Sequence, residues 1–159
     1  MASSKLRIVK TTYAHIDSLK GRLREADDME CRAWSGMSAD HALERGFEDS
    51  ALCWTGMKGR EPFCCFGVAP FSMLSSKGIP WMLGTDDIAK CKKFVIRNSK
   101  PYIKLILTMY TELENYVDVR NEVSINWLKW CGFKFDEPKR IGVEGKPFHR
   151  FWLKGEDYV

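Results

Sequence analysis

Carboxylate side chains are the groups of this chain best suited to take a proton from a bound molecule. Glu25 and Asp27 fall in a segment with helical spacing, and Asp118 and Glu144 lie in the last third of the chain. A carboxylate that reaches a reacting group can act as a general base, directly or through a water molecule. Surface solvation and helix capping are the other common roles of such residues, so the sequence leaves all four open.

Thiol and metal chemistry is less well supported. Cys64 and Cys65 are adjacent, and neighbouring side chains of a strand point to opposite faces, which suits packing better than nucleophilic catalysis. No CxxC pair occurs, and the histidines lie far from any paired cysteines, so the spacing of a metal site is missing. We therefore expect no metal and interpret the six cysteines as reduced, mostly buried thiols.

Composition and charge indicate a globular protein. With 159 residues, 45% of them hydrophobic, the chain can bury a core as one domain over residues 1–159. The formal charge of +4 arises from interspersed basic and acidic residues, which is typical of a solvated surface, so we expect no nucleic acid partner. No run approaches the roughly 18 apolar residues that cross a bilayer, and the first ten residues lack the apolar stretch of a signal peptide. We expect no membrane contact and a cytoplasmic location.

One basic run is a local exception to this mixed surface. It lies on a segment with helical spacing and is usually explained as a solvated helix face, with binding of a phosphate or an acidic partner as the alternative. The run comprises Lys90, Lys92, Lys93, Arg97, Lys100 and Lys104.

The first third of the chain predicts one strand followed by helices. Residues 6–10 alternate apolar and polar, as a half-buried strand does. From Ala14 the apolar spacing becomes helical, behind a possible Thr12 cap. Two further helices are expected over 24–34 and 38–45, the second of which should end at a glycine.

The middle of the chain predicts antiparallel strands and then a long helix. Short apolar runs separated by glycine and proline turns fall at 51–57, 62–69 and 79–83. Residues 87–113 have helical spacing throughout. Pro101 lies inside this stretch and should either kink the helix or mark the first turn of a second one.

The last third predicts a strand, a helix and a terminal hairpin. The expected strand covers 116–119, the helix 123–131 and the next strand 133–135, and the hairpin pairs 140–143 with 147–153. Strands that alternate with helices beside antiparallel strands indicate an α/β fold, with a mixed sheet and helices on both faces.

The segment 121–133 carries the most specific pattern, NEVSINWLKWCGF. Asn121 can cap a helix, Ser124 lets the helix approach its neighbours, and Gly132 can end it. This pattern resembles the closing helix of the GNAT acetyltransferases. The resemblance implies a GNAT-like, mostly antiparallel sheet in which one strand splays from its neighbour and admits the pantetheine arm of acetyl-CoA.

The same resemblance implies where that arm and the acceptor would bind. The arm would lie between strands 79–83 and 116–119, and the acceptor would be an amine of a small molecule or a protein. By the resemblance, Glu25 and Asp27 lie on the early helix that overhangs the acceptor pocket, and Glu25 is the candidate base. The residues implied for cofactor binding are Met82, Leu83, Gly84, Asn121 and Ser124.

Four longer runs are similar to a second, narrower group. The runs at 23–27, 80–86, 115–121 and 142–151 resemble the podophage internal virion protein A family, which is tied to virion or tail morphogenesis. This resemblance implies a phage or prophage origin, the host cytoplasm or the virion as location, and a phage or host protein as partner.

Two departures from the GNAT pattern bear on catalysis. The loop after 79–83 offers only Gly84 and is followed by Asp86 and Asp87, which would repel a diphosphate unless they serve as helix caps. Leu128 stands where many members have a tyrosine that protonates the departing thiolate. Tyr116 or water would have to replace that acid, although Tyr116 also fits a core or rim position.

These observations support two functional hypotheses. The first is an acetyl-CoA-dependent N-acetyltransferase that acts on an amine. The second is a non-catalytic virion-assembly or host-interaction protein that retains the GNAT fold. The sequence leaves open which of the two applies, and therefore whether the protein is an enzyme.

Overall fold

The computed structural model of the protein describes residues 5–158. Its eight strands form one sheet with the order β1-β2-β3-β4-β5-β8-β6, and β7 pairs with β8 off this path. The strands are β1 (Leu6–Lys10), β2 (Leu52–Lys58), β3 (Glu61–Pro70), β4 (Lys77–Gly84), β5 (Glu112–Asp118), β6 (Lys134–Phe135), β7 (Lys139–Ile141) and β8 (Lys146–Lys154). The helices are α1 (Tyr13–Leu19), α2 (Glu25–Ser35), α3 (Ala39–Asp49), α4 (Asp87–Lys90), α5 (Lys92–Ile106) and α6 (Glu122–Trp130), with a 3₁₀ turn at Gly155–Asp157.

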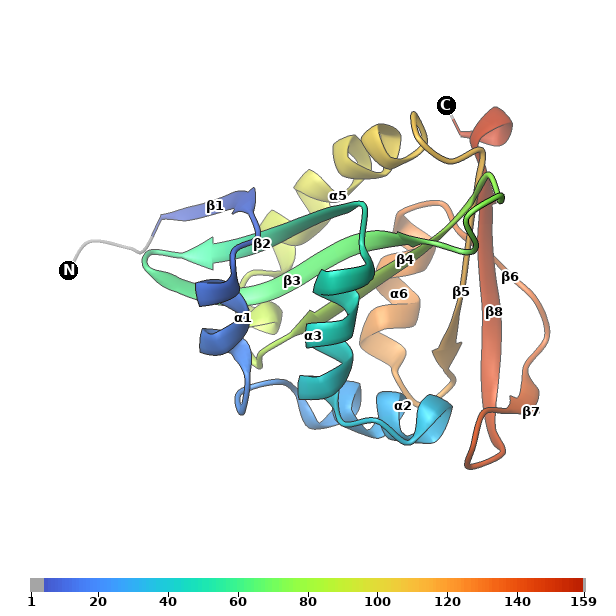
Figure 1. Ribbon diagram of the computed structural model, residues 1–159, viewed down its shortest axis with the longest axis horizontal. Coiled ribbons are helices and arrows are strands. Elements are labelled where there is room, and N and C mark those ends of the chain that lie inside the picture. The colour runs from blue at the N-terminus through green and yellow to red at the C-terminus, as the bar shows by residue number, and fades with distance from the viewer. Residues whose placement is uncertain (1–4, 159) are drawn as a thin grey trace.

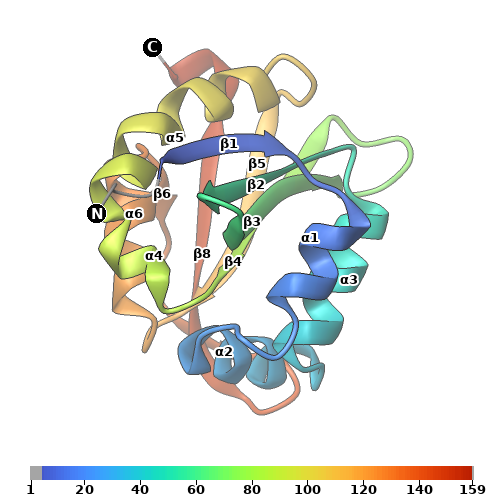
Figure 2. The same cartoon turned by 90° about the vertical axis from the view of Figure 1, so that its left-hand side faces the viewer.

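Helices cover both faces of the sheet, as the sequence predicts. Helices α1 and α3 lie on one face, and α4, α5 and α6 lie on the other (Figure 2). Every strand pair is antiparallel except β4 with β5. Cys65 packs with α1 and α3, while Cys64 belongs to the cluster beside α4 and α5, so the two cysteines face opposite sides as predicted. All six cysteines are free thiols.

Helix α1 begins where the Thr12 cap predicts, but α3 is longer than expected. The Thr12 hydroxyl accepts a hydrogen bond from His15 N, at the first turn of α1. The predicted end of α3 at Gly46 is wrong, because the helix continues to Asp49. A Cβ at Gly46 would lie 2.9 Å from the Trp81 ring, so this glycine permits close packing of α3 on β4 and does not end the helix.

The predicted long helix over 87–113 is also wrong in its extent. It is interrupted at Cys91 and ends at Ile106, and Pro101 lies inside α5 rather than in its first turn. Residues 112–118 form β5, which pairs with β8. Leu113 is fully buried within this pairing, so its apolar spacing reflects a strand in the core and not another helical turn.

Strands β4 and β5 separate soon after they meet. Their parallel pairing is limited to Lys77 with Glu112 and Gly78 with Leu113. The two strands then diverge toward their carboxyl ends, and α2 lies across the opening (Figure 1). Because neither strand has a neighbour on this side beyond Gly78 and Leu113, backbone groups face the gap. None of the helices described in residues 5–158 is long and apolar enough to span a membrane.

Candidate functional site

The edge of β4 that faces the gap can be identified from its pairing with β3. Thr85 N donates to Phe63 O at 2.9 Å, on the β3 side. Peptide groups of a strand alternate between its two edges, so Leu83 also pairs with β3, whereas Met82 and Gly84 face the gap. Of the three β4 residues predicted to bind a cofactor through their backbone, Leu83 does not present its peptide groups to the gap.

Most groups along this edge of β4 already have partners. Gly84 N donates to Asp27 Oδ2 at 3.1 Å, and Gly84 O accepts from Arg24 N at 2.9 Å. Pro80 has no N–H, and its carbonyl accepts from Asn115 Nδ2 at 2.8 Å. Within the described part of the chain, Met82 therefore keeps the only N–H group of residues 79–84 that faces the gap without a protein partner.

The Asn115 side chain closes the narrow end of the gap. Its Nδ2 group reaches Pro80 O on β4, and its Oδ1 atom accepts from Tyr116 N at 2.8 Å on β5. The Asn115 carboxamide thus supplies the hydrogen bonds that β4 and β5 no longer form with each other at this point. The open part of the gap begins beyond Asn115, next to Met82.

A cavity of about 470 Å³ passes through the sheet at this gap. Its lining residues come from helices on opposite faces, which requires a passage between the separated strands. On the α5 and α6 side they include Phe94, Asn98, Tyr102, Ser124 and Trp127. On the α2 and α3 side they include Glu30, Cys31, Trp34, Met37, Arg45 and Asp49, and Met82 and Tyr116 lie between the two sets.

Of the two carboxylates that line the cavity, Glu30 and Asp49, Glu30 is the one bound to β5 and α6. Its Oε1 atom accepts from Asp118 N at 2.9 Å, and its Oε2 atom accepts from Asn121 Nδ2 at 2.6 Å. Burial raises the pKa of Glu30 to about 7, further supported by the nearby charges of Asp27 and Asp118, although the two hydrogen bonds oppose the shift. A carboxyl group with a pKa near neutrality is suited to general base catalysis.

A polar network next to Glu30 ties α2 to the carboxyl ends of β4 and β5. Arg24 forms an ion pair with Asp27 at 2.7 Å, and only 12% and 4% of these side chains are exposed. Arg24 Nη2 also reaches Asn121 Oδ1 at 3.5 Å, and the same oxygen accepts from Ser124 N at 3.4 Å to cap α6. The network fixes the position of Glu30, because both of its partners belong to it or adjoin it.

Aromatic rings form one wall of the cavity on the α2 side. Trp34 stacks on Tyr116 with a centroid distance of 4.8 Å and an interplanar angle of 24°, and its edge contacts Phe148. The tip of the β7–β8 hairpin is bound to the same part of α2, since Val143 N donates to Trp34 O at 3.1 Å and Glu144 N to Ala33 O at 3.2 Å. The hairpin and the end of α2 therefore form a common rim.

Gly142 permits this contact, and its replacement should destabilise the protein. Gly142 has a φ of 79°, and an added Cβ would lie 2.6 Å from Ala33 O. We expect Gly142→Ala to lower the free energy of unfolding by about 3 kcal/mol, from left-handed backbone strain plus the clash. Gly145→Ala is the matched control, because Gly145 also has a positive φ of 64° but nothing lies within 4 Å of an added Cβ. Equal losses in urea unfolding of the two variants would contradict the clash.

Some of the remaining predicted site residues line the cavity, and others do not. Glu25 begins α2, is exposed, and does not line the cavity, so Glu30 takes the position expected of Glu25. Tyr116 lines the cavity, as do Ser124 and the Leu83 side chain. Gly84 and Asn121 lie in the polar network at the edge of the gap. Glu30 could have been found from the sequence, since it lies three residues after Asp27 and therefore on the same helix face.

Both departures from the GNAT pattern have structural explanations. Leu128 is a buried residue of α6 that belongs to the same core cluster as Val117, and it also lines the cavity. Asp86 is exposed, and Asp87 pairs with Lys90 at 3.6 Å. All residues of the basic run, from Lys90 at the end of α4 to Lys104 on α5, are exposed, as on a solvated face. Residues 5–158 contain no cluster of His, Cys, Asp and Glu side chains that could hold a metal ion.

Comparisons with known proteins identify the fold. No family model matches the chain, and no curated protein matches it in sequence. Solved structures match over nearly the whole length. The yncA protein of Salmonella typhimurium with its cofactor acetyl-CoA has a TM-score of 0.69 at 9% identity, covering 97% of this chain and 96% of that one.

Two further structures agree with this match. An aminoglycoside N(6')acetyltransferase from Legionella pneumophila has a TM-score of 0.68 at 10% identity, with 99% and 96% of the two chains covered. An acetyltransferase of the GNAT family from Streptococcus pneumoniae has a TM-score of 0.65 at 10% identity, with 94% and 99% covered. None of these three is described as a virion protein. At such low identity the likeness establishes the fold alone, and this chain has the fold of the GNAT acetyltransferases.

Proposed function

We propose that the protein is an N-acetyltransferase that uses acetyl-CoA to acylate an amine. The cavity through the β4–β5 gap carries the proposal, because it connects the two faces of the sheet next to the unpartnered Met82 N–H. Such a passage lets a donor enter from one face and an acceptor from the other. Glu30 lies on the α2 side of the passage, where a base for the acceptor is needed.

The residues on the α5 and α6 side fit the arm of acetyl-CoA. That part of the cavity is mostly apolar, with polar groups from Asn98 and Ser124, and Met82 offers a backbone N–H to an amide or acyl oxygen. When bound, acetyl-CoA supplies an acyl group activated as a thioester. The diphosphate fits less well, because Gly84 N is held by Asp27, so we assign recognition mainly to the arm. The exposed basic residues of α5 carry positive charge, opposite in sign to the charge of the diphosphate.

Three groups of the chain have distinct roles in this proposal. The Met82 N–H donates a hydrogen bond to the acyl oxygen, which gains negative charge as the amine attacks. The Glu30 carboxylate takes the proton from the amine, directly or through water. The Tyr116 hydroxyl, which has no hydrogen-bond partner among the described residues, is the candidate acid for the departing group. Glu30 replaces Glu25 in this assignment, since Glu25 lies outside the cavity.

A thermal shift with acetyl-CoA tests donor binding. A ligand at one hundred times its dissociation constant adds about 2.7 kcal/mol to stability, which corresponds to roughly 5–10 °C for a chain of this size. Glu30→Gln should show the same shift, since Glu30 lies on the acceptor side. Absence of any shift at millimolar acetyl-CoA would contradict the proposal.

One observation favours a second candidate function, that of a non-catalytic protein. Both peptide groups of Gly84 are already held by α2, at the position where GNAT enzymes present amides to the diphosphate. An assembly or host-interaction protein of a phage, as the podophage resemblance suggests, could keep the fold in this closed form. A protein that shows neither a thermal shift nor acyl transfer, yet forms a stable complex with a virion protein, would support this candidate.

A further inference from the structure

The acceptor side of the cavity limits which amines the protein can accept. Resting on the proposed function, we propose that the acceptor is a primary amine with a single positive charge on a flat, apolar body, such as an arylalkylamine. Polyamines and aminoglycosides, which carry several ammonium groups, are disfavoured by the same geometry. The inference follows from the charges, the aromatic wall and the rim of the cavity.

Carboxylates on the acceptor side are few. Glu30 and Asp49 line the cavity there, and Asp49 forms an ion pair with Arg45 at 3.4 Å. Arg45 and Asp49 are more than half exposed and lie at the rim, where their charges cancel. Glu30 is thus the one acidic lining residue of residues 5–158 without a cationic side-chain partner. A buried ammonium group needs a counter-charge, so the cavity provides for one such group.

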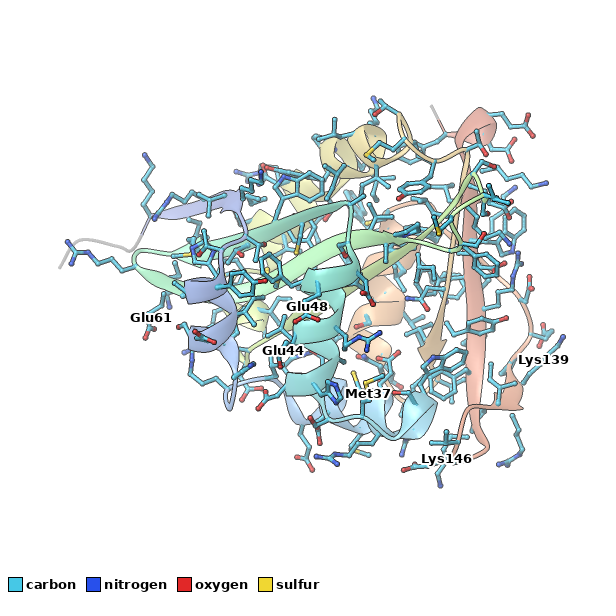
Figure 3. All side chains as sticks on the ribbon, in the orientation of Figure 1. Met37, Glu44, Glu48, Glu61, Lys139 and Lys146 are labelled. Carbon is cyan, nitrogen blue, oxygen red and sulfur yellow. The ribbon has the colours of Figure 1, made fainter. Side chains whose placement is uncertain are left out.

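Other acidic residues nearby do not add to this count. Figure 3 shows Met37 between α3 and the end of α2, with Glu44 and Glu48 on α3. Neither glutamate lines the cavity, and Glu44 pairs with Lys20 at 3.2 Å. The hairpin beside the rim carries Lys139 and Lys146 (Figure 3), and its tip also carries the exposed Glu144, which does not line the cavity and acts on Arg120. The hairpin thus adds no net acidic charge that would attract a ligand with several positive charges.

The aromatic wall favours a flat apolar body. Trp34 and Tyr116 stack nearly parallel, and Trp34 is still 38% exposed although it lines the cavity. A ring placed against this wall would bury apolar surface that now meets water, and aromatic pairs contribute beyond the buried area. Cys31, Met37 and Trp81 complete a lining without further charge. A ring on this wall and an ammonium group at Glu30 would use both features at once.

An acyl-transfer assay with a panel of amines tests the inference. With acetyl-CoA as donor at pH 8, release of free thiol is measured for phenethylamine, tryptamine, spermidine and kanamycin. We expect kcat/KM for the two arylalkylamines to exceed that for spermidine and kanamycin at least tenfold. Trp34→Ala should raise KM for phenethylamine about tenfold with little change in kcat or in the KM for acetyl-CoA. Trp34→Phe should restore most of the affinity.

The possible outcomes separate the inference from the proposed function. Faster transfer to spermidine or kanamycin than to either arylalkylamine would overturn the inference and leave the acetyltransferase function standing. Transfer to none of the amines, by a protein that also shows no thermal shift with acetyl-CoA, would overturn the function itself. An unchanged KM for phenethylamine in folded Trp34→Ala would exclude the aromatic wall as the binding surface.

Discussion

Glu30→Gln is expected to lower kcat for amine acetylation by a factor of about 10²–10⁴, the usual contribution of a general base. Glutamine keeps the size of the side chain and resembles the protonated acid, but it cannot take a proton from the amine. Steady-state kinetics with a saturating amine measures the loss. Glu25→Gln is the matched control, because Glu25 is exposed on the same helix and lies outside the cavity. Equal activity of the two variants would rule out Glu30 as the base.

The pH dependence offers a second measure of Glu30. Because the pKa of Glu30 is raised to about 7, kcat of the wild-type protein should increase from pH 6 to 8 as the carboxyl group ionises. This rising limb should be absent from the residual activity of Glu30→Gln. A limb that persists unchanged in the variant would mean that another group controls the rate.

The contribution of Glu30 to folding stability should fall as the pH rises, whereas kcat should increase. The folded-state pKa lies above the ordinary value of 4.5, so the stabilisation from protonated Glu30 is fully present below about pH 4.5 and is lost as the pH rises through about 7. The wild-type protein should therefore lose up to about 3 kcal/mol relative to Glu30→Gln between pH 4.5 and pH 8. Urea unfolding of both proteins at these two pH values isolates this contribution from those of other carboxylates.

Met82→Pro is expected to reduce kcat by a factor of about 10²–10³, the loss typical of one missing oxyanion donor. Proline removes the N–H together with the methionine side chain, and because the Met82 N–H faces the gap instead of β3, no sheet hydrogen bond is lost. Pro80 already occupies the equivalent edge position two residues earlier, which shows that β4 accommodates proline there. The measurement is acyl transfer by protein whose circular dichroism spectrum matches the wild type.

The control for Met82→Pro is Met82→Leu, which keeps the N–H and a similar side-chain volume. This variant should retain kcat within a few fold, although its affinity for the donor can change. Full activity of well-folded Met82→Pro would show that the β4 backbone does not stabilise the acyl oxygen. A loss of equal size in Met82→Leu would assign the effect to the side chain instead.

Some of the site was predictable from the sequence, and some of it required the fold. The α6 segment and its Asn121 cap were predicted, as was a gap between the strands before and after the long helix. Of the predicted cofactor residues on β4, Met82 directs its peptide groups into the gap, whereas Leu83 directs its peptide groups toward β3. This difference depends on the β3 register, which apolar spacing alone does not reveal. The sequence also indicates Asp27 as a candidate carboxylate, but the hydrogen bond that its Oδ2 atom accepts from Gly84 N joins residues far apart in the chain.

The candidate base on α2 shows the same difference between what the sequence predicts and what the fold decides, since the sequence indicates Glu25 and the fold places Glu30 at the cavity. Both lie on α2, and the helical period places them on different sides of the helix. Helix periodicity, strand alternation and capping depend on neighbouring residues, so the sequence by itself determined the order of most elements and the Thr12 and Asn121 caps, but not the ends of α3 and α5. The tertiary structure decided which carboxylate meets the cavity and which backbone N–H remains unpaired. Those features arise where α2 packs across the ends of β4 and β5, and such long-range pairing depends on the packing of the whole chain.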